Sequence, residues 1–280
     1  MDLYTNKNLI LESNCEVEDA KFVLLGIPFD STSTYRTGSR FAPLEIRKEF
    51  LELEKESGKK SFFDVKFCDL GNIEVVHGNL QKTFERVVHT MQNTFKKNEN
   101  FVPIVLGGEH TLTYPILKIL NERKKISMLH LDAHLDLRDD YLGEKWNHST
   151  VMRRVSELGV KITSMGVRSM SNEESKFAKE KGMDYCGVDV TKIKKLLKKT
   201  KGKNLYITLD MDVLDPSVAP GVSNPEPNGI SLNTLIEIIN VSKKQNNIVG
   251  FDIMEVNPLF DNGATTVTAA KLLLDFMLLK

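Results

Sequence analysis

Short apolar runs alternate with segments of helical periodicity along most of the 280-residue chain. The apolar runs predict strands at residues 22–27, 67–70, 101–106, 126–131, 161–166, near Tyr185, 205–209 and 248–254. Apolar residues at helical spacing predict helices that begin near Pro43, cover 79–97, begin at Thr111, cover 149–158 and 172–181, begin at Val190, cover 232–244 and begin near Thr266. Thr111 is the expected cap of its helix.

This alternation of strands and helices predicts an α/β protein with a parallel sheet that helices cover on both faces. No internal repeat, low-complexity tract or Pro/Gly-rich linker interrupts the pattern. We therefore interpret residues 1–280 as a single domain. In sheets of this kind, ligands bind beyond the carboxyl ends of the strands.

Acids and a histidine stand at the end of one predicted strand. The stretch ISMLHLDAHLD, residues 126–136, places Asp132, His134 and Asp136 at every second position. Residues two apart in an extended chain point to the same side. We therefore expect these three side chains to face one point in space.

Two further predicted strands end in the same way. The apolar run of residues 204–216 ends in Asp210 and Asp212, and the run of residues 101–110 ends in His110. One Asp-x-Asp pair alone is typical of a turn, and one strand-end histidine is typical of a core or cap residue. Together they indicate a metal site, because buried carboxylates need compensating charge and no Lys or Arg lies within these clusters. Four Asp and two His are too many ligands for one small ion and suit two.

The same segments resemble the signatures of the ureohydrolases, the arginase and agmatinase family of binuclear manganese enzymes. The matching motifs are GGEH, DAHLD and LDMDVLDPSVAPG. The resemblance extends from GIPFDSTSTYRTGSRFAP near the N-terminus to DIMEVNP near the C-terminus, and agmatinases are the most similar branch. It implies a three-layer α/β/α sandwich with a mainly parallel central sheet. Glu109 stands where many relatives carry Asp, whereas His110 keeps the ligand position.

The resemblance also implies two Mn²⁺ ions held by a shared set of side chains. The metal-binding residues that it assigns are His110, Asp132, His134, Asp136, Asp210 and Asp212. Asp132 and Asp210 would bridge the two ions. Oxygen-rich ligation without cysteine favours manganese over zinc. Two metal ions lower the pKa of a shared water, which supplies a nucleophile near neutral pH.

Three side chains are expected to take part in catalysis. Asp136 is placed to hold the attacking group and relay its proton. His148, in the loop WNHST, matches the family histidine that moves protons, although a lone loop histidine is more typical of a surface. Glu255, at the end of an apolar strand, is expected to hold the guanidinium through a charge-assisted pair. His130, one step deeper than the ligands, is interpreted as a core or supporting residue.

Composition excludes several other classes of function. The 38 basic residues balance the 38 acidic ones, so neither nucleic acid nor an anionic membrane is an expected partner. No apolar stretch is long enough to span a bilayer. The mixed N-terminus is unlike a signal peptide and the three cysteines are widely spaced, so we expect a cytoplasmic protein without disulfides. The lysine-rich run at 192–203 is interpreted as the solvated face of a helix.

The substrate is expected to be a small guanidino compound. Four carboxylates balance two divalent ions, and a bridging hydroxide leaves the centre about one unit negative, so a cationic guanidinium suits it better than an anionic phosphate. The loop LRDDYLGEKWNHST, residues 137–150, is acidic and aromatic, which resembles agmatinases rather than the Ser and Asn groups of arginases. Agmatine, cleaved to putrescine and urea, is therefore the predicted substrate.

Several alternatives stay open. The same chemistry could act on N1-aminopropylagmatine, guanidinobutyrate, arginine or formimidoylglutamate. A carboxylate-bearing substrate needs a cation at the pocket mouth, and Arg168 and Lys145 are the candidates; the role of Arg168 is otherwise open. A catalytically silent metal-binding homologue is a further alternative, although all six ligands are present. Zinc deacetylases share the fold class, but their site uses one zinc and fewer Asp ligands, so the six candidate ligands argue against this alternative. By analogy with relatives, we expect a homo-oligomer, either a trimer or a hexamer.

Overall fold

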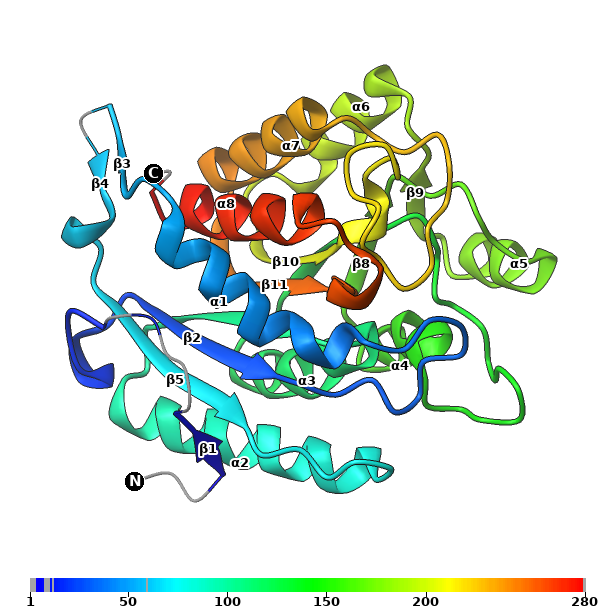
Figure 1. The fold of residues 1–280 in the computed structure, drawn as a ribbon. Coiled ribbons are helices and arrows are strands. Elements are labelled where there is room, and N and C mark those ends of the chain that lie inside the picture. The colour runs from blue at the N-terminus through cyan, green and yellow to red at the C-terminus, as the bar shows by residue number, and fades with distance from the viewer. Residues whose placement is uncertain (1–3, 8–10, 12, 59, 279–280) are drawn as a thin grey trace.

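A nine-stranded sheet forms the centre of the molecule (Figure 1). The computed structural model describes residues 4–7, 11, 13–58 and 60–278. In spatial order the strands are β1 (Thr5–Asn6), β5 (Phe67–Ile73), β2 (Phe22–Ile27), β6 (Val102–Gly107), β11 (Asn247–Met254), β10 (Asn204–Asp210), β7 (Ser127–Leu131), β8 (Lys161–Met165) and β9 (Asp184–Cys186). β1 pairs antiparallel with β5, and the other neighbours in this sheet pair parallel. A separate hairpin joins β3 (Glu56–Ser57) to β4 (Lys60–Ser61).

Helices cover both faces of the sheet (Figure 1). One face carries α1 (Ala42–Glu52), α6 (Val190–Thr200), α7 (Leu232–Gln245) and α8 (Ala264–Leu278). The other carries α2 (Leu80–Lys97), α3 (Thr113–Arg123), α4 (Val151–Glu157) and α5 (Asn172–Glu180). The predicted three-layer α/β/α sandwich is confirmed. In the part of the chain that is described, no helix combines the length and apolarity needed to cross a membrane.

Alternating residues of the central strands pack into two separate hydrophobic cores, one on each face of the sheet. Leu205, Ile207 and Leu209 of β10 pack in the core beneath α1, α6, α7 and α8. Tyr206 of the same strand packs in the core beneath α2 to α5. Because both faces are buried, the strand sequences are continuous apolar runs, which is why they could be found in the sequence.

Two predicted details were wrong. β5 does not end at Gly71 but continues to Ile73, because Gly71 adopts a φ of 82° and lets the strand proceed to its antiparallel partner β1. Thr111 does not cap α3: a 3₁₀ turn at His110–Leu112 comes first, and α3 begins at Thr113 without a side-chain cap.

The two glycines before His110 are required by close packing. A Cβ on Gly107 would lie 1.8 Å from Sδ of Met254, and a Cβ on Gly108 would lie 2.0 Å from the carbonyl oxygen of Phe29. Neither glycine has a positive φ, so close approach rather than turn geometry is the constraint. It is strict at Gly108, which faces backbone, and weaker at Gly107, which faces the flexible Met254 side chain. This packing fixes the end of β6, from which His110 projects.

Candidate active site

The carboxyl ends of three strands bring the predicted ligands to one edge of the sheet. Asp132 directly follows β7, Asp210 is the last residue of β10, and Asp212 lies in the 3₁₀ turn after it. His110 opens the 3₁₀ turn that follows β6. β6, β11, β10 and β7 are consecutive and parallel, so these ends meet at the same place.

The segment after β7 is not the extended strand that the every-second-residue pattern suggested. β7 ends at Leu131, and Asp136 has a φ of 53°, in the left-handed region. His134 forms a single parallel bridge with Ser169. The side chains therefore converge through a turn, and the prediction of an extended segment from Asp132 to Asp136 was wrong.

The first group of side chains surrounds Nδ1 of His110. This atom lies 3.1 Å from Oδ2 of Asp132, 3.2 Å from Oδ2 of Asp210 and 3.6 Å from Oδ2 of Asp136. All four side chains are buried. Asp132 and Asp210 thus point to the same place, which is the arrangement that two bridging ligands require.

A second group forms around Nδ1 of His134. This atom lies 3.0 Å from Oδ2 of Asp212 and 3.4 Å from Oδ1 of Asp132. Asp132 therefore presents one carboxylate oxygen to His110 and the other to His134. Asp210 and Asp212 are joined by a 2.9 Å hydrogen bond from the Asp212 amide to Oδ1 of Asp210. The structure brings all six predicted side chains together.

The charge and hydrogen bonding of this cluster fit divalent cations. Nδ1 of His110 is buried and, within the described residues, has no hydrogen-bond partner despite its three carboxylate neighbours. Burial raises the pKa of Asp136 and of Asp210 well above its usual range, and nearby carboxylates raise it further. Such a cluster of oxygens and imidazoles needs positive charge, and hard or borderline divalent ions suit it.

Neighbouring polar groups orient both ends of the cluster. Nε2 of His130 lies 2.8 Å from Oδ2 of Asp132, and its Nδ1 lies 3.1 Å from the Ser164 hydroxyl. His130 is fully buried, in agreement with its interpretation as a supporting residue. Nε2 of His134 lies 3.0 Å from the side-chain amide of Asn224, a contact that the sequence did not indicate.

Glu255 lies against the cluster in a strained conformation. Its φ is 61°, and a non-glycine residue holds this left-handed region only where its surroundings enforce it. Oε1 accepts a 2.8 Å hydrogen bond from the His110 amide, whereas Oε2 is buried without a partner in the described chain. Burial raises the pKa of Glu255 to about 8, and a cation beside the carboxyl would lower this pKa again by favouring the charged form. An unpaired buried carboxylate oxygen is suited to accept a hydrogen bond from a cationic ligand.

His148 faces the cluster from the loop before α4. Its Nε2 lies 2.8 Å from the hydroxyl of Thr34. Burial and, second to it, the charge of His134 lower the pKa of His148 to about 4, so the ring is neutral near pH 7. A cavity of about 20 Å³ is lined by His148, Glu255 and members of both histidine groups.

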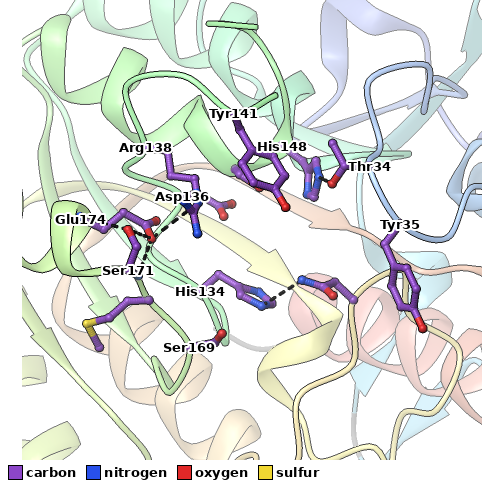
Figure 2. Close-up of a pocket in the computed structure, with 13 residues that line it drawn as sticks. Thr34, Tyr35, His134, Asp136, Arg138, Tyr141, His148, Ser169, Ser171 and Glu174 are labelled. Atoms are coloured by element: carbon purple, nitrogen blue, oxygen red, sulfur yellow. Dashed lines mark hydrogen bonds and ion pairs between the residues drawn. The ribbon is translucent and has the colours of Figure 1, made fainter. Parts of the chain in front are cut away.

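A larger pocket of about 500 Å³ opens above this cavity (Figure 2). His134, Asp136 and His148 line both spaces, so the pocket leads to the cluster. Its remaining walls come from four loops and the first turn of α5, and include Thr34, Tyr35, Arg138, Tyr141, Ser169, Met170, Ser171, Glu174 and Asn224. Arg138 and Tyr141 belong to the loop of residues 137–150 that the sequence indicated as acidic and aromatic. The other wall residues were not singled out, because residues far apart in the chain carry no pattern that predicts their proximity.

Arg168, whose role the sequence left open, binds backbone carbonyl groups. Nη2 donates to the carbonyls of Asp212 and Glu226 at 2.7 and 2.6 Å, and Nε donates to the carbonyl of Pro227 at 2.9 Å. It therefore ties the loop around Glu226 to the segment that carries Asp212. This guanidinium does not line the pocket, whereas that of Arg138 does.

Fold and site together define a class of protein. It is a three-layer α/β/α protein with a carboxylate–histidine centre, suited to a pair of divalent cations, at the carboxyl ends of its parallel strands. The model of the arginase family matches residues 20–279, and the chain belongs to this family. The predicted relationship to the arginase and agmatinase enzymes is thus confirmed.

Three relatives illustrate the range of the similarity. The agmatinase of Bacillus cereus is 36% identical, over 99% of this chain and 97% of its own. The N(1)-aminopropylagmatine ureohydrolase of Thermococcus kodakarensis is 38% identical, over 97% of this chain and 95% of its own. The crystal structure of the agmatine ureohydrolase of Thermoplasma volcanium is 35% identical with a TM-score of 0.85, and the match covers 95% of this chain and 91% of that one.

Proposed function

We propose that the chain is a binuclear manganese hydrolase that cleaves agmatine to putrescine and urea. One observation carries this proposal: two histidine–carboxylate groups share Asp132 at the base of a pocket of about 500 Å³. Two Mn²⁺ ions, when bound, lower the pKa of a water and so supply a nucleophile at neutral pH. Water adds to the guanidino carbon of agmatine. The bond between this carbon and the nitrogen on the aliphatic part of agmatine then breaks, urea forms, and putrescine leaves as the protonated amine.

The proposed ligands follow the two groups. His110, Asp132, Asp136 and Asp210 would hold one ion, and His134, Asp132, Asp210 and Asp212 would hold the other. Support comes from the Asp132 carboxylate, which has one oxygen toward each histidine. The orphaned Nδ1 of His110 supplies the lone pair that a cation requires.

Three side chains would act on the substrate and its protons. Glu255 would bind the guanidinium through the oxygen that has no partner in the described chain. His148, neutral near pH 7, would accept a proton and pass it to the leaving amine. Asp136, which belongs to the His110 group and also lines the pocket, would hold the attacking water in place by accepting its hydrogen bond.

The pocket walls favour a short aliphatic chain with a cationic end. Tyr35, Tyr141 and Met170 offer apolar surface along the pocket, and the carboxylates of Asp136 and Glu174 outnumber the guanidinium of Arg138. Relatives that are about 35% identical over nearly the whole chain bear the name agmatinase. Agmatine, with four methylene groups between guanidinium and amine, matches these walls.

Arg138 favours a second candidate substrate. This side chain lines the pocket, and its Nε lies 3.9 Å from Oε2 of Glu174, beyond hydrogen-bond distance. A guanidinium in this place is able to bind the carboxylate of guanidinobutyrate. Arg138 also lies over the ring of Tyr141, 4.8 Å from its centroid, which holds it at the wall.

A substrate panel tests the proposal. Manganese-loaded protein is incubated with agmatine, N1-aminopropylagmatine, guanidinobutyrate and arginine, and urea is measured together with bound metal. We expect the highest kcat/KM for agmatine, and no urea from the Asp132→Asn variant. Arg138→Gln should leave agmatine hydrolysis in place and abolish any activity on guanidinobutyrate. Urea from arginine alone would overturn the substrate, and no urea from any compound at full manganese occupancy would overturn the activity.

The predicted single domain over residues 1–280, the homo-oligomer and the cytoplasmic location stay predictions. Gel filtration with light scattering would test the oligomer, for which we expect a trimer or a hexamer.

A further inference from the structure

Asp252 lies buried within β11 with a fully hydrogen-bonded carboxylate. Oδ2 accepts from the hydroxyls of Tyr206 and Thr113, at 2.8 and 2.9 Å. Oδ1 accepts from the Thr208 hydroxyl at 2.5 Å and from the Leu209 amide at 3.3 Å. None of its surface is exposed, so this carboxylate does not contact the pocket. Four donors for one buried acid indicate a specific arrangement rather than an incidental contact.

Thr208 connects this carboxylate to His110. The Thr208 hydroxyl oxygen lies 2.8 Å from Nε2 of His110. A hydroxyl has one proton to donate, and the short contact to Asp252 uses it. The same oxygen therefore accepts the Nε2 proton of His110. The result is a chain of donors that runs from His110 through Thr208 to Asp252.

This chain decides which nitrogen of His110 is free. With the proton on Nε2, the lone pair of the neutral ring lies on Nδ1. Nδ1 is the atom that faces Asp132, Asp136 and Asp210 without a hydrogen-bond partner among the described residues. The three carboxylates by themselves would attract a proton to Nδ1. A cation bound there would displace this proton, and the contact with Thr208 keeps the other proton on Nε2, so the lone pair of Nδ1 would face the cation.

We propose that Asp252 is a positioning residue that acts through Thr208 to hold the His110 ring with its proton on Nε2 and its Nδ1 lone pair toward the metal centre. The inference rests on the proposed metal centre. It goes further by assigning a role to a residue that touches neither metal nor substrate. Hydrogen bonds to the outer nitrogen of a ligating histidine fix its orientation and raise its basicity, and their loss costs about 10- to 100-fold in metal affinity.

Four variants separate this role from a merely structural one. Thr208→Val keeps the shape of the side chain and removes the hydroxyl, whereas Thr208→Ser keeps the hydroxyl. Asp252→Asn keeps the volume of the acid and removes its charge. Tyr206→Phe is the matched control, because it also removes one donor to Asp252 in the core but leaves the contact between Thr208 and His110 intact.

Two measurements are made on each full-length variant. Titration with Mn²⁺, followed by the electron paramagnetic resonance signal of the free ion, gives the affinity and number of bound ions. Proton–nitrogen NMR of protein labelled with ¹⁵N-histidine, free of metal, reports the Nε2 proton of His110, which is seen only if a hydrogen bond slows its exchange with water. Circular dichroism confirms that each variant is folded.

We expect Thr208→Val to bind one of the two ions about 10- to 100-fold more weakly and to lose the Nε2 proton signal. Asp252→Asn should shift both readouts in the same direction, and Thr208→Ser and Tyr206→Phe should resemble the wild type. Wild-type affinity and an unchanged Nε2 signal in Thr208→Val would overturn the inference, as would equal weakening by Tyr206→Phe. A wild-type protein that binds no manganese would overturn the proposed function instead, and the NMR comparison would still decide the placement of the proton.

Discussion

The hydroxyl of Thr34 lies 2.8 Å from Nε2 of His148, although 114 positions separate the two residues in the chain. Thr34 belongs to the loop between β2 and α1, which forms part of the pocket wall. The buried carboxylate of Glu109 accepts the Thr32 amide at 2.8 Å and also the Thr32 hydroxyl. Glu109 thereby holds the loop that orients His148.

Removal of the Thr34 hydroxyl should lower activity without disturbing the metal centre. One hydrogen bond contributes about 0.5–1.5 kcal/mol, so we expect Thr34→Val to reduce kcat/KM for agmatine about 2- to 10-fold. Thr34→Ser keeps the hydroxyl and should retain the wild-type value. Steady-state kinetics with bound manganese measured on the same samples check this. Unchanged kcat/KM in Thr34→Val would show that the contact does not support catalysis.

Neutralising Glu255 should weaken substrate binding more strongly. Glu255→Gln keeps an oxygen that can accept the His110 amide and removes the charge that would pair with the guanidinium. A hydrogen bond to a charged group contributes about 1.5–3 kcal/mol, so kcat/KM should fall about 10- to 150-fold. Manganese stoichiometry should stay the same. Glu237→Gln, on the exposed face of α7, serves as the control, and a loss of bound metal in Glu255→Gln would contradict the assignment.

A buried ion pair between α1 and β5 should dominate the stability of that side of the sheet. Arg47 and Asp69 are both fully buried, and two bonds of 2.8 and 2.9 Å join them. Asp69→Ala leaves the guanidinium without its counter-charge, which costs about 3–5 kcal/mol in the free energy of unfolding. Lys48→Met, at an exposed pair, should change it by less than about 0.5 kcal/mol. Urea denaturation of the three proteins measures both effects.

The double variant Arg47→Met/Asp69→Leu distinguishes an unpaired charge from a lost contact. It removes both charges and fills the space with apolar groups, which is often nearly neutral for buried pairs. We expect it to be more stable than Asp69→Ala alone. If the double variant is the less stable of the two, the pair itself stabilises the fold beyond the cost of an isolated charge.

The sequence predicted the central strands well because burial on both faces makes them continuous apolar runs. β2 was predicted with its observed bounds, and the other central strands to within a residue or two at each end. The antiparallel strand β1 and the hairpin of β3 and β4 are only two residues each, too short for periodicity to reveal them. β5 was predicted too short because a glycine such as Gly71 often ends a strand. Here Gly71 adopts a positive φ and the strand continues beyond it to Ile73.

The six predicted ligands could be named from the sequence because strand ends in a parallel sheet share one edge. Their local geometry could not be predicted. Asp136 and Glu255 have left-handed backbone conformations, which their residue types do not predict and which tertiary contacts enforce. Thr34, Arg138 and Asn224 lie in loops, and only the folded chain shows which loops meet above the cluster.

The titration of the cluster determines how the metal-free protein responds to pH. Burial and neighbouring carboxylates raise the pKa of Asp136 and of Asp210 well above its usual range. Burial opposes the charged form of His110 and of His134, but the aspartates that surround both rings outweigh it and raise both pKa values. Each of these groups binds more protons folded than unfolded, so each contribution to stability is lost as pH rises from the unfolded pKa through the folded one.

The aspartates begin to contribute to this loss above about pH 4 and the histidines above about pH 6.5, so metal-free protein should lose stability throughout the range above about pH 6.5, where both act. The lowered pKa of His148, about 4, acts with the opposite sign, but only below that window. Manganese replaces the bound protons, so the rise in Tm that it causes should grow between about pH 6.5 and 8.5. Thermal unfolding with chelator and with Mn²⁺, at several pH values, measures both trends.

Asp210→Asn is the matched comparison. This variant lacks one of the carboxyls with a raised pKa, and all other titratable groups are the same in both proteins. The Tm of the metal-free variant should therefore fall less steeply with pH than that of the wild type. If the metal-free Tm falls equally with pH in both proteins, the carboxyl of Asp210 titrates alike in the folded and the unfolded chain. The idea that this buried carboxylate controls the loss of stability with pH would then be wrong.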